Sequence, residues 1–347
     1  MDLPQLWFVI VAFFWLGYLV LEGFDFGVGM VMRPLSRTDT DRRLIINTIG
    51  PVWDGNEVWV IVAGAATFAA FPEWYATMFS GFYLPLLVIL AALIVRGVAF
   101  EFRGKINDDT WRARWDWAIT LGSWTPAIMW GLAFANLVRG VELTADHQMV
   151  SSLPDLLSPY ALLGAATTTL LFATHGAIFL ALKTAGEMRE RAGRLAAMLA
   201  VPTALVAGAF AIWTQLAHSV HLWTWAAVAT AAVGLVVVLV ATRARREGWA
   251  FGASALVIAA AVVLIFGSLF PNVMPAINDP AHSLTIANAS STEYTLTIMT
   301  WVSAFLTPLI IGYQGWTYWV FRKRLTAEVI PPHTGLPART RAGADGR

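Results

Sequence analysis

The stretch Gly50–Phe71, GPVWDGNEVWVIVAGAATFAAF, is apolar enough to lie in a membrane, yet it opens with two acids, Asp54 and Glu57. Trp53 and Trp59 flank these acids. An ionisable side chain at the centre of a helix in lipid costs roughly 2.5–3.5 kcal/mol on insertion scales. Because a spacing of three residues places both acids on one helix face, we expect that face to point away from lipid.

A second apolar stretch, Leu16–Met30 (LGYLVLEGFDFGVGM), repeats the pattern with Glu22 and Asp25. These two acids are also three residues apart, so they share one face of a helix. The two stretches together predict two membrane helices whose acidic faces are turned toward protein.

The composition is that of a polytopic membrane protein. Hydrophobic residues make up 58% of the 347 residues and charged residues 13%, whereas a soluble domain averages about 25% charged. The chain has no cysteine, which excludes disulfides, Fe–S clusters and thiolate-bound metals. Walker A, dinucleotide-binding and HExxH motifs are also missing. We therefore predict no metal site, and the net charge of +1 gives no indication of a nucleic-acid partner.

Nine stretches approach the length of about 20 apolar residues that a membrane-spanning helix needs. The sequence therefore predicts an all-α fold with nine transmembrane helices. The predicted spans are residues 6–30, 50–71, 76–100, 117–138, 157–182, 195–217, 222–242, 249–271 and 293–321.

The basic residues test this number of spans. Of the 23 Lys and Arg residues, all but Arg96 and Arg139 fall in alternate connections or after the last span. Because basic loops stay in the cytoplasm, the N-terminus is predicted outside and the C-terminus inside. We expect a membrane domain over residues 1–325, an ordered outer cap or contact surface over residues 271–292, and a disordered cytoplasmic tail over residues 326–347.

This orientation places both acidic pairs at similar depth, in the cytoplasmic third of the first two spans. Such carboxylates could form a proton-uptake path, since neighbouring buried acids titrate together. They could instead cap helix starts, bond to a partner subunit, or pair with Arg33, Arg42 or Arg96. Arg96, inside the third span, is the candidate charge partner. The candidates for the proton path are Glu22, Asp25, Asp54 and Glu57.

The histidines argue against haem binding by this chain. A haem inside a bundle needs inward-facing axial ligands, usually His or Met. Only His175 lies well inside a predicted span, and one buried His cannot supply two ligands. The ten methionines are scattered in a way typical of packing residues. We expect His175 to be a hydrogen-bonded contact between helices.

Several segments of the sequence closely resemble subunit II of the cytochrome bd quinol oxidases. The resemblance covers residues 1–325, and the combination of GFDFGVGM with WDGNEVW is its most specific part. The matching segments are EGFDFGVGM (22–30), GPVWDGNEVWVIVAGAATFAAFP (50–72), FSGFYLPL (79–86), residues 96–103, RWDWAITLGSWTP (114–126), FPNVMP (270–275) and MTWVSAFLTPLIIGYQGWTYW (299–319).

The resemblance implies two four-helix bundles plus one extra helix in the bacterial cytoplasmic membrane. It implies a heterodimeric terminal oxidase that oxidises membrane quinol and reduces O2 to water. The haems b558, b595 and d and the quinol site would belong to subunit I, which this chain would stabilise without being active alone. Small single-helix accessory subunits and a structural quinone or lipid are further expectations.

The resemblance also carries roles onto individual residues. Asp54 matches the acid of the WDGN motif, and in the family this acid is assigned to a proton path. Asp25 matches the acid in GFD. Trp59 matches an aromatic residue near an oxygen route. Glu22 and Glu57 match positions that vary within the family. His175 matches no ligand of the family.

Two functions of other classes also fit a membrane protein with intramembrane acids. One is a proton-coupled secondary transporter, and the other is a purely structural membrane scaffold in which the acids only pair with a partner. Transporters of this kind often carry repeats with interrupted helices, but the late half of the sequence has no acidic pair to match the early ones.

Overall fold

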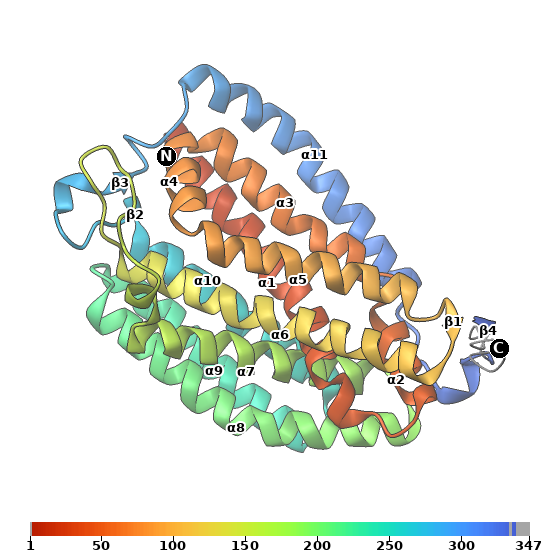
Figure 1. Cartoon of the computed structure of the whole chain (residues 1–347). Helices are drawn as coiled ribbons and strands as arrows, with labels where there is room; N and C mark the ends of the chain where they lie inside the picture. The colour runs from red at the N-terminus through yellow and green to blue at the C-terminus, as the bar shows by residue number, and fades with distance from the viewer. Residues whose placement is uncertain (1, 333–334, 338–347) are drawn as a thin grey trace, which may run out of the picture.

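The computed structural model describes residues 2–332 and 335–337 and is built almost entirely from helices (Figure 1). The α-helices are α1 (Leu3–Leu35), α2 (Asp39–Ile49), α3 (Trp53–Ala70), α4 (Pro72–Gly81), α5 (Tyr83–Phe102), α6 (Asp109–Arg139), α7 (Pro159–Lys183), α8 (Gly186–Ala217), α9 (Trp225–Arg243), α10 (Glu247–Leu269) and α11 (Glu293–Val320). The short strands are β1 (Ile106–Asn107), β2 (Asn272–Met274), β3 (Leu284–Thr285) and β4 (Leu336–Pro337). Four single turns of 3-10 helix complete the described structure: η1 (Pro154–Leu157), η2 (Leu222–Thr224), η3 (Pro280–His282) and η4 (Ala327–Val329).

The long helices lie side by side in two packed groups (Figure 1). The first group contains α1, α3, α5 and α6, and the second contains α7, α8, α9 and α10. Contacts of α1 and α6 with α7 join the two groups. Helix α11 lies at the edge of the molecule, alongside α1 and α3.

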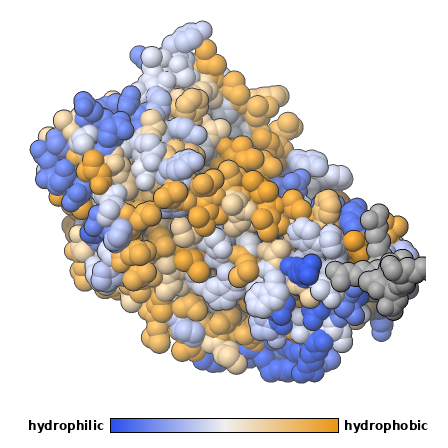
Figure 2. All heavy atoms as spheres, viewed as in Figure 1, coloured by the Kyte–Doolittle hydropathy of each residue, from blue (hydrophilic) through white to orange (hydrophobic). Residues whose placement is uncertain are grey.

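The surface has the character of a membrane protein. In the visible face of Figure 2, hydrophobic residues form a band across the middle, and hydrophilic residues gather at both ends. Among the described helices, eight are long and apolar enough to cross a membrane: α1, α5, α6, α7, α8, α9 with its preceding turn, α10 and α11. Helix α3 is not among them, because its 18 residues begin with Asp54 and Glu57.

Two local features differ from the sequence prediction. The single span predicted over residues 76–100 is two helices, α4 and α5, which meet at Phe82. Pro85 has no N–H to bond the carbonyl of Gly81, so one hydrogen bond of a continuous helix is missing at this point. Helix α2 was not predicted because it is short and polar. It begins at a capping box in which Thr38 and Asp41 bond each other's backbone.

Ion pairs link the loops and helix ends that are rich in basic residues at one end of the bundle. The pairs join α2 to α8 and α5, and α8 to α10 and to the turn before it. The shortest of them are Arg37–Glu187 (2.7 Å), Arg103–Asp39 (2.6 Å), Arg191–Asp41 (3.0 Å), Arg189–Glu247 (2.7 Å) and Arg245–Glu190 (2.7 Å). The basic residues that alternate along the sequence therefore do meet in space, and we refer to this part of the molecule as the arginine-rich end.

Asp41 shows how the arginine-rich end is held together. Its carboxylate accepts hydrogen bonds from the backbone N–H groups of Arg37 (2.8 Å) and Thr38 (3.3 Å), and it pairs with Arg191. Partial burial acts to raise the pKa of Asp41, but the N–H groups and the guanidinium outweigh it and lower the pKa below its ordinary value. Asp41 is therefore a stable anion that fixes α2 to α8.

The two long loops close the opposite end. Strands β2 and β3 pair antiparallel, and Val141 bridges to Ala276. The side chain of Asn278 accepts from the backbone N–H of Leu143 (3.0 Å) and donates to its carbonyl (2.8 Å). Residues 271–292 thus form an ordered cap over the loop that follows α6.

The tail predicted to be disordered, residues 326–347, lies partly outside the described residues, at 333–334 and 338–347. In the described part, β4 pairs in parallel with β1. The Leu336 N–H donates to the Lys105 carbonyl (2.9 Å), and Arg43 donates to the Pro331 carbonyl (2.6 Å). These contacts lie at the arginine-rich end.

Helices α1 and α7 cross at two glycines with their backbones in contact. A Cβ added at Gly27 would lie 1.8 Å from the carbonyl oxygen of Phe172, and one added at Gly176 would lie 2.2 Å from the carbonyl carbon of Gly27. Close approach at small residues is a common way to pack helices in membranes, where van der Waals contact replaces the hydrophobic effect. The crossing holds the two helix groups together.

We expect Gly27→Ala to destabilise the protein by about 3 kcal/mol, since the added methyl meets backbone that cannot move aside. The matched control is Gly208→Ala on α8, where a Cβ would have no neighbour within 4 Å. The thermal midpoint of the purified protein in detergent measures both. Equal midpoints for the two variants would show that the α1–α7 crossing is not tight.

Candidate functional site

Arg96 lies at the centre of a buried charge cluster. It projects from α5, and its side chain is fully buried. Its Nη1 donates a very short hydrogen bond to Glu22 of α1 and lies 3.7 Å from the Glu57 carboxylate of α3. Its guanidinium carbon is 4.9 Å and 5.1 Å from the ring centroids of Phe26 and Phe100. The predicted charge partner is therefore shared by two of the four predicted acids.

A glycine on α6 makes room for this arginine. A Cβ added at Gly122 would lie 2.8 Å from the Cβ of Arg96 and 2.9 Å from the carbonyl of Ala92. Gly97, beside Arg96 in the sequence, has only Trp53 nearby, at 3.6 Å. The close approach that buries Arg96 thus comes from α6, which sequence reasoning missed because a lone glycine in TLGSW carries no distinguishing pattern.

Asp25 belongs to a second, hydrogen-bonded group. Asn56 Nδ2 of α3 donates to Asp25 Oδ2 (2.6 Å). Asn56 Oδ1 accepts from Gln314 Nε2 (2.9 Å) and from the Tyr318 hydroxyl (2.7 Å), both on α11. The network therefore ties α1, α3 and α11 together around a buried carboxylate. Asn56, Gln314 and Tyr318 were not predicted, although Gln314 and Tyr318 are polar side chains four residues apart on an apolar helix.

Trp59 of α3 also belongs to this hydrogen-bonded network. Its Nε1–H donates to Gln314 Oε1 (2.7 Å). Its ring packs over Gly17, where an added Cβ would lie 2.6 Å from the indole, and against Phe13 and Phe14. The predicted oxygen-route residue is thus a rigid element between α1, α3 and α11.

Asp54 lies apart from the other acids. It is exposed and lines a groove of about 370 Å³ between α3 and α11. Trp59, Gln314 and Tyr318 line the same groove. The inner wall of the groove therefore contains Gln314 and Tyr318, which bond Asn56. Asn56 in turn bonds Asp25. The structure brings Glu22, Glu57 and Arg96 together, sets Asp25 against the groove wall, and places Asp54 on the groove surface.

The cluster carries more carboxylates than cations. Its two carboxylates, Glu22 and Glu57, share one guanidinium, and an unpaired buried charge is costly. Within the described residues, Glu22 Oε2, Asp25 Oδ1 and Arg96 Nη2 are buried without a hydrogen-bond partner. The two carboxylate oxygens can accept a hydrogen bond from water or take up a proton, whereas Arg96 Nη2 can only donate a hydrogen bond. The arrangement can therefore accept protons, which a cluster of fully paired ions could not do without breaking contacts.

The other arginines considered as partners of the acids have different contacts. Arg42 lies 3.6 Å from Asp116 on α6, and Arg33 stacks over Trp117, 3.9 Å from its ring centroid. Among these three arginines, Arg96 is thus the one that pairs with Glu22 and Glu57. In residues 2–332 and 335–337, no three His, Asp or Glu side chains gather in a way that could hold a metal ion.

His175 makes hydrogen bonds and ring contacts with neighbouring helices. Its Nδ1 lies 2.7 Å from Ser254 Oγ, and its Nε2 lies 3.3 Å from the carbonyl of Val20. Because a carbonyl only accepts, the contact with Val20 requires a proton on Nε2, while the hydroxyl of Ser254 also lies 2.9 Å from the Phe251 carbonyl and has one proton to donate. The ring also stacks on Phe251, with centroids 4.6 Å apart. Both nitrogens are engaged between helices α1, α7 and α10, as expected for a structural contact.

The fold and this site define a class: a polytopic helical membrane protein with an ion-paired cluster of Glu22, Glu57 and Arg96 inside its helix bundle. Comparisons narrow the class. Residues 3–321 match the sequence profile of the family described as cytochrome bd terminal oxidase subunit II. The chain belongs to this family, and it is subunit II of a quinol oxidase.

Individual relatives agree along nearly their whole length. The cytochrome bd ubiquinol oxidase subunit 2 of Bacillus subtilis (strain 168) is 42% identical over 331 residues, which cover 94% of this chain and 97% of the relative. The cytochrome bd-I ubiquinol oxidase subunit 2 of Escherichia coli (strain K12) is 34% identical over 366 residues, covering 95% and 97%. A chain in the structure of bd oxidase from Geobacillus thermodenitrificans shares the fold, with a TM-score of 0.75, 20% identity and coverage of 92% of this chain and 99% of that one.

Family membership places the chain in a respiratory complex that contains haem and another oxidase subunit. The complex is held in a membrane, in agreement with the eight apolar helices.

Proposed function

We propose that this chain is the subunit of the oxidase that ligates no haem, and that it carries protons from the arginine-rich end toward the haems of its partner. The complex would oxidise membrane quinol and reduce O2 to water, and this chain would be inactive alone. The observation that carries the proposal is the buried group of Glu22, Glu57 and Arg96 beside the bonded pair Asp25–Asn56.

The proposed topology has nine spans, with the N-terminus outside and the C-terminus in the cytoplasm of a bacterium. Helix α3 would be the second span, since Asn56 faces Asp25 of α1 and Glu57 faces Arg96 of α5 rather than lipid. The arginine-rich end would then face the cytoplasm by the positive-inside rule. The two helix groups would be the two four-helix bundles, and α11 the extra helix.

The proposed proton route begins at the groove. Asp54 would collect protons at the groove surface, where water reaches it. Asp25 would receive them behind the wall formed by Gln314 and Tyr318. Glu22, one helical turn from Asp25, and Glu57 would complete the route, with Arg96 holding their negative charge in place. Their excess of carboxylates lets the cluster take up a proton without gaining a net positive charge.

The face that carries α11 is the proposed contact with haem-bearing subunit I. In the most apolar 18 residues of α11, only 6% are buried within the chain, whereas 72% are buried in the corresponding stretch of α7. Aromatic side chains such as Trp301 and Phe305 are exposed on this face, and the groove lined by Asp54 opens there. A partner seated on α11 would cover the groove and receive protons from it. Accessory subunits and a bound structural quinone or lipid stay predictions.

The haems b558, b595 and d would all belong to subunit I. In this chain both nitrogens of His175 are engaged. Outside the α-helices, His221 Nε2 lies 2.8 Å from the Phe270 carbonyl, and His282 Nδ1 lies 2.9 Å from the Leu143 carbonyl. These bonds support a role without haem ligation.

The composition of the complex tests this proposal. A complex purified through a tag on this chain should contain a second, haem-bearing polypeptide, and its absorption spectrum should show haem. After dissociation, the haem should remain with the partner. Recovery of this chain alone with stoichiometric haem would overturn the assignment.

The groove is also the proposed path for oxygen, with Trp59 as part of its wall. Gly55 lines the groove, and a Cβ there would have no neighbour within 4 Å. We expect Gly55→Leu to fill the groove and to raise the KM for O2 severalfold, with kcat largely kept. The matched control is Gly208→Leu on α8, where a Cβ also has no neighbour within 4 Å and which lies outside the groove. An equal KM for O2 in the two variants would rule out this path.

A further inference from the structure

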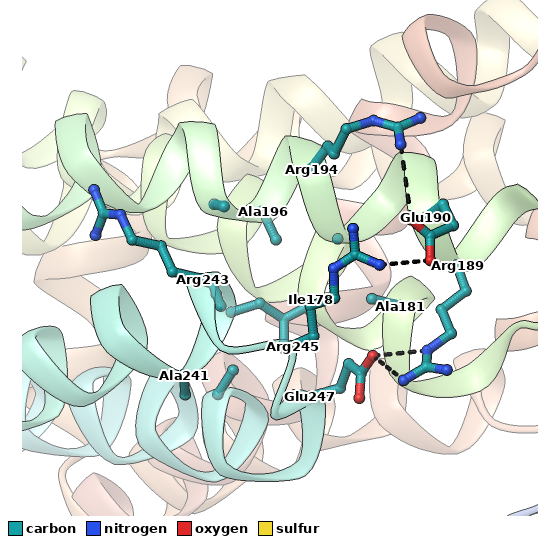
Figure 3. Close-up of a pocket in the computed structure, with 14 residues that line it drawn as sticks. Ile178, Ala181, Arg189, Glu190, Arg194, Ala196, Ala241, Arg243, Arg245 and Glu247 are labelled. Atoms are coloured by element: carbon teal, nitrogen blue, oxygen red, sulfur yellow. Dashed lines mark hydrogen bonds and ion pairs between the residues drawn. The ribbon is translucent and has the colours of Figure 1, made fainter.

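A second cavity, of about 210 Å³, opens at the arginine-rich end, where α8 begins and α9 turns into α10 (Figure 3). It shares no residue with the groove or with the buried acid cluster. Four arginines line it: Arg189, Arg194, Arg243 and Arg245. Its inner surface is made of small apolar side chains of α7, α8, α9 and α10, among them Ala181, Ala196, Ala241 and Ala250.

Two carboxylates, Glu190 and Glu247, pair with three of these four arginines. Glu190 lies 2.7 Å from Arg245 and 3.8 Å from Arg194. Glu247 lies 2.7 Å from Arg189 and is also approached by Arg324, at 3.7 Å. Arg243 donates to the carbonyl of Leu239 in its own helix and has no carboxylate within ion-pair distance among the described residues. The cavity therefore carries a surplus of positive charge.

Arg245 reaches the cavity through an unusual backbone. Its φ is 54°, in the left-handed region that residues other than glycine seldom adopt. This conformation lies in the tight turn between α9 and α10 and brings the guanidinium against Glu190, as Figure 3 shows. Helix α10 starts at the cavity without a side-chain cap, so the positive end of its dipole adds to the local field.

The surroundings of the cavity are those of a membrane interface. Trp249, next to the cavity on α10, is 74% exposed, and an exposed indole is typical of headgroup depth. From Arg194 an exposed apolar stripe runs along α8 through Met198 and Leu205, at helical spacing. From Arg243 a second stripe runs back along α9 through Val240, Val236 and Val233. The two helices pack against each other, so the stripes lie on neighbouring elements.

We propose that this cavity binds the phosphodiester headgroup of an anionic phospholipid, with its acyl chains lying along the exposed stripes of α8 and α9. Basic pockets between membrane helices are suited to such headgroups. Inorganic phosphate would satisfy the same arginines, but it would make no use of the apolar stripes that begin at Arg194 and Arg243. The stripes therefore favour a lipid.

The test uses the purified oxidase complex in neutral detergent, with phosphatidylglycerol, phosphatidylcholine or inorganic phosphate added. Phosphatidylglycerol should raise the thermal midpoint at low concentration, and phosphatidylcholine should not. The double variant Arg243→Gln/Arg245→Gln should need about tenfold more phosphatidylglycerol or more for the same shift, since each basic residue near an anionic lipid adds to binding. The control Arg114→Gln removes an exposed charge of the same end, outside the cavity, and should leave the response unchanged.

A steric variant separates lipid binding from loss of charge. Gly193 lines the cavity, and a Cβ there would have no neighbour within 4 Å, so Gly193→Leu fills the cavity without a clash. This variant should lose phosphatidylglycerol retained in native mass spectra while keeping all four arginines. Unchanged lipid retention in both the double variant and Gly193→Leu would overturn the proposal. An equal shift of the wild type by inorganic phosphate would also overturn it, in favour of a soluble phosphate ligand.

Discussion

Replacing Arg96 by Gln is expected to destabilise the folded chain by about 3–5 kcal/mol, because removal of one partner leaves a buried charge uncompensated. Glu22 would lose its hydrogen-bonded partner, and Glu57 the cation 3.7 Å away. The complex should therefore accumulate at low levels and lose its partner easily. Thermal unfolding of the purified complex and the yield from membranes measure the effect.

A surface arginine provides the matched control. Arg37 pairs with Glu187 at 2.7 Å, but both side chains are about two-thirds exposed or more, at 70% and 65%. Arg37→Gln should change stability by less than about 1 kcal/mol, as exposed pairs do. The double variant Arg96→Gln/Glu22→Gln should recover part of the loss, since two amides can bond each other without charge. If Arg96→Gln were as stable as Arg37→Gln, the cluster would not be buried as described.

Replacing Asp25 by Asn is expected to lower turnover by about 100-fold, at the low end of what a positioned acid or base contributes. The amide keeps the shape of the side chain and its contact with Asn56, but it cannot carry a proton. Asp25→Glu retains a titratable group and should keep more of the activity. Turnover is measured as quinol-dependent O2 consumption, normalised to the haem content of the complex.

Asp54→Asn should have a smaller effect, about tenfold or less, because water in the groove can reach the interior without this carboxylate. A drop in turnover per haem in both variants, with assembly kept, supports the proton route. Loss of assembly with normal turnover of the remaining complex would instead assign both acids a structural role.

The sequence was informative where charged side chains occur within stretches apolar enough to lie in a membrane. Glu22, Asp25, Glu57 and Arg96 stand out because charge in lipid needs a partner, and the structure places three of them in contact. The alternation of basic residues likewise predicted the gathering at one end. These inferences rest on strong energetic penalties that a linear sequence displays directly.

Other features depend on packing that the sequence does not display. The roles of Gln314 and Tyr318 arise because α11, more than 250 residues after Asn56, lies beside α3. Gly122 matters only because α6 crosses Arg96 at that residue. The position of Asp54, on the groove rather than in the cluster, depends on the rotation of α3. The break at Phe82 was missed because the apolar run continues through it.

The central claim is that this chain delivers protons to its partner from the arginine-rich end. Its most direct test is the rate of proton uptake in oriented liposomes, after the reduced complex is mixed with O2, with a pH indicator on the arginine-rich side. Asp25→Asn should slow this uptake at unchanged haem content, whereas the surface control Arg37→Gln should not. Uptake at the wild-type rate in Asp25→Asn would contradict the claim.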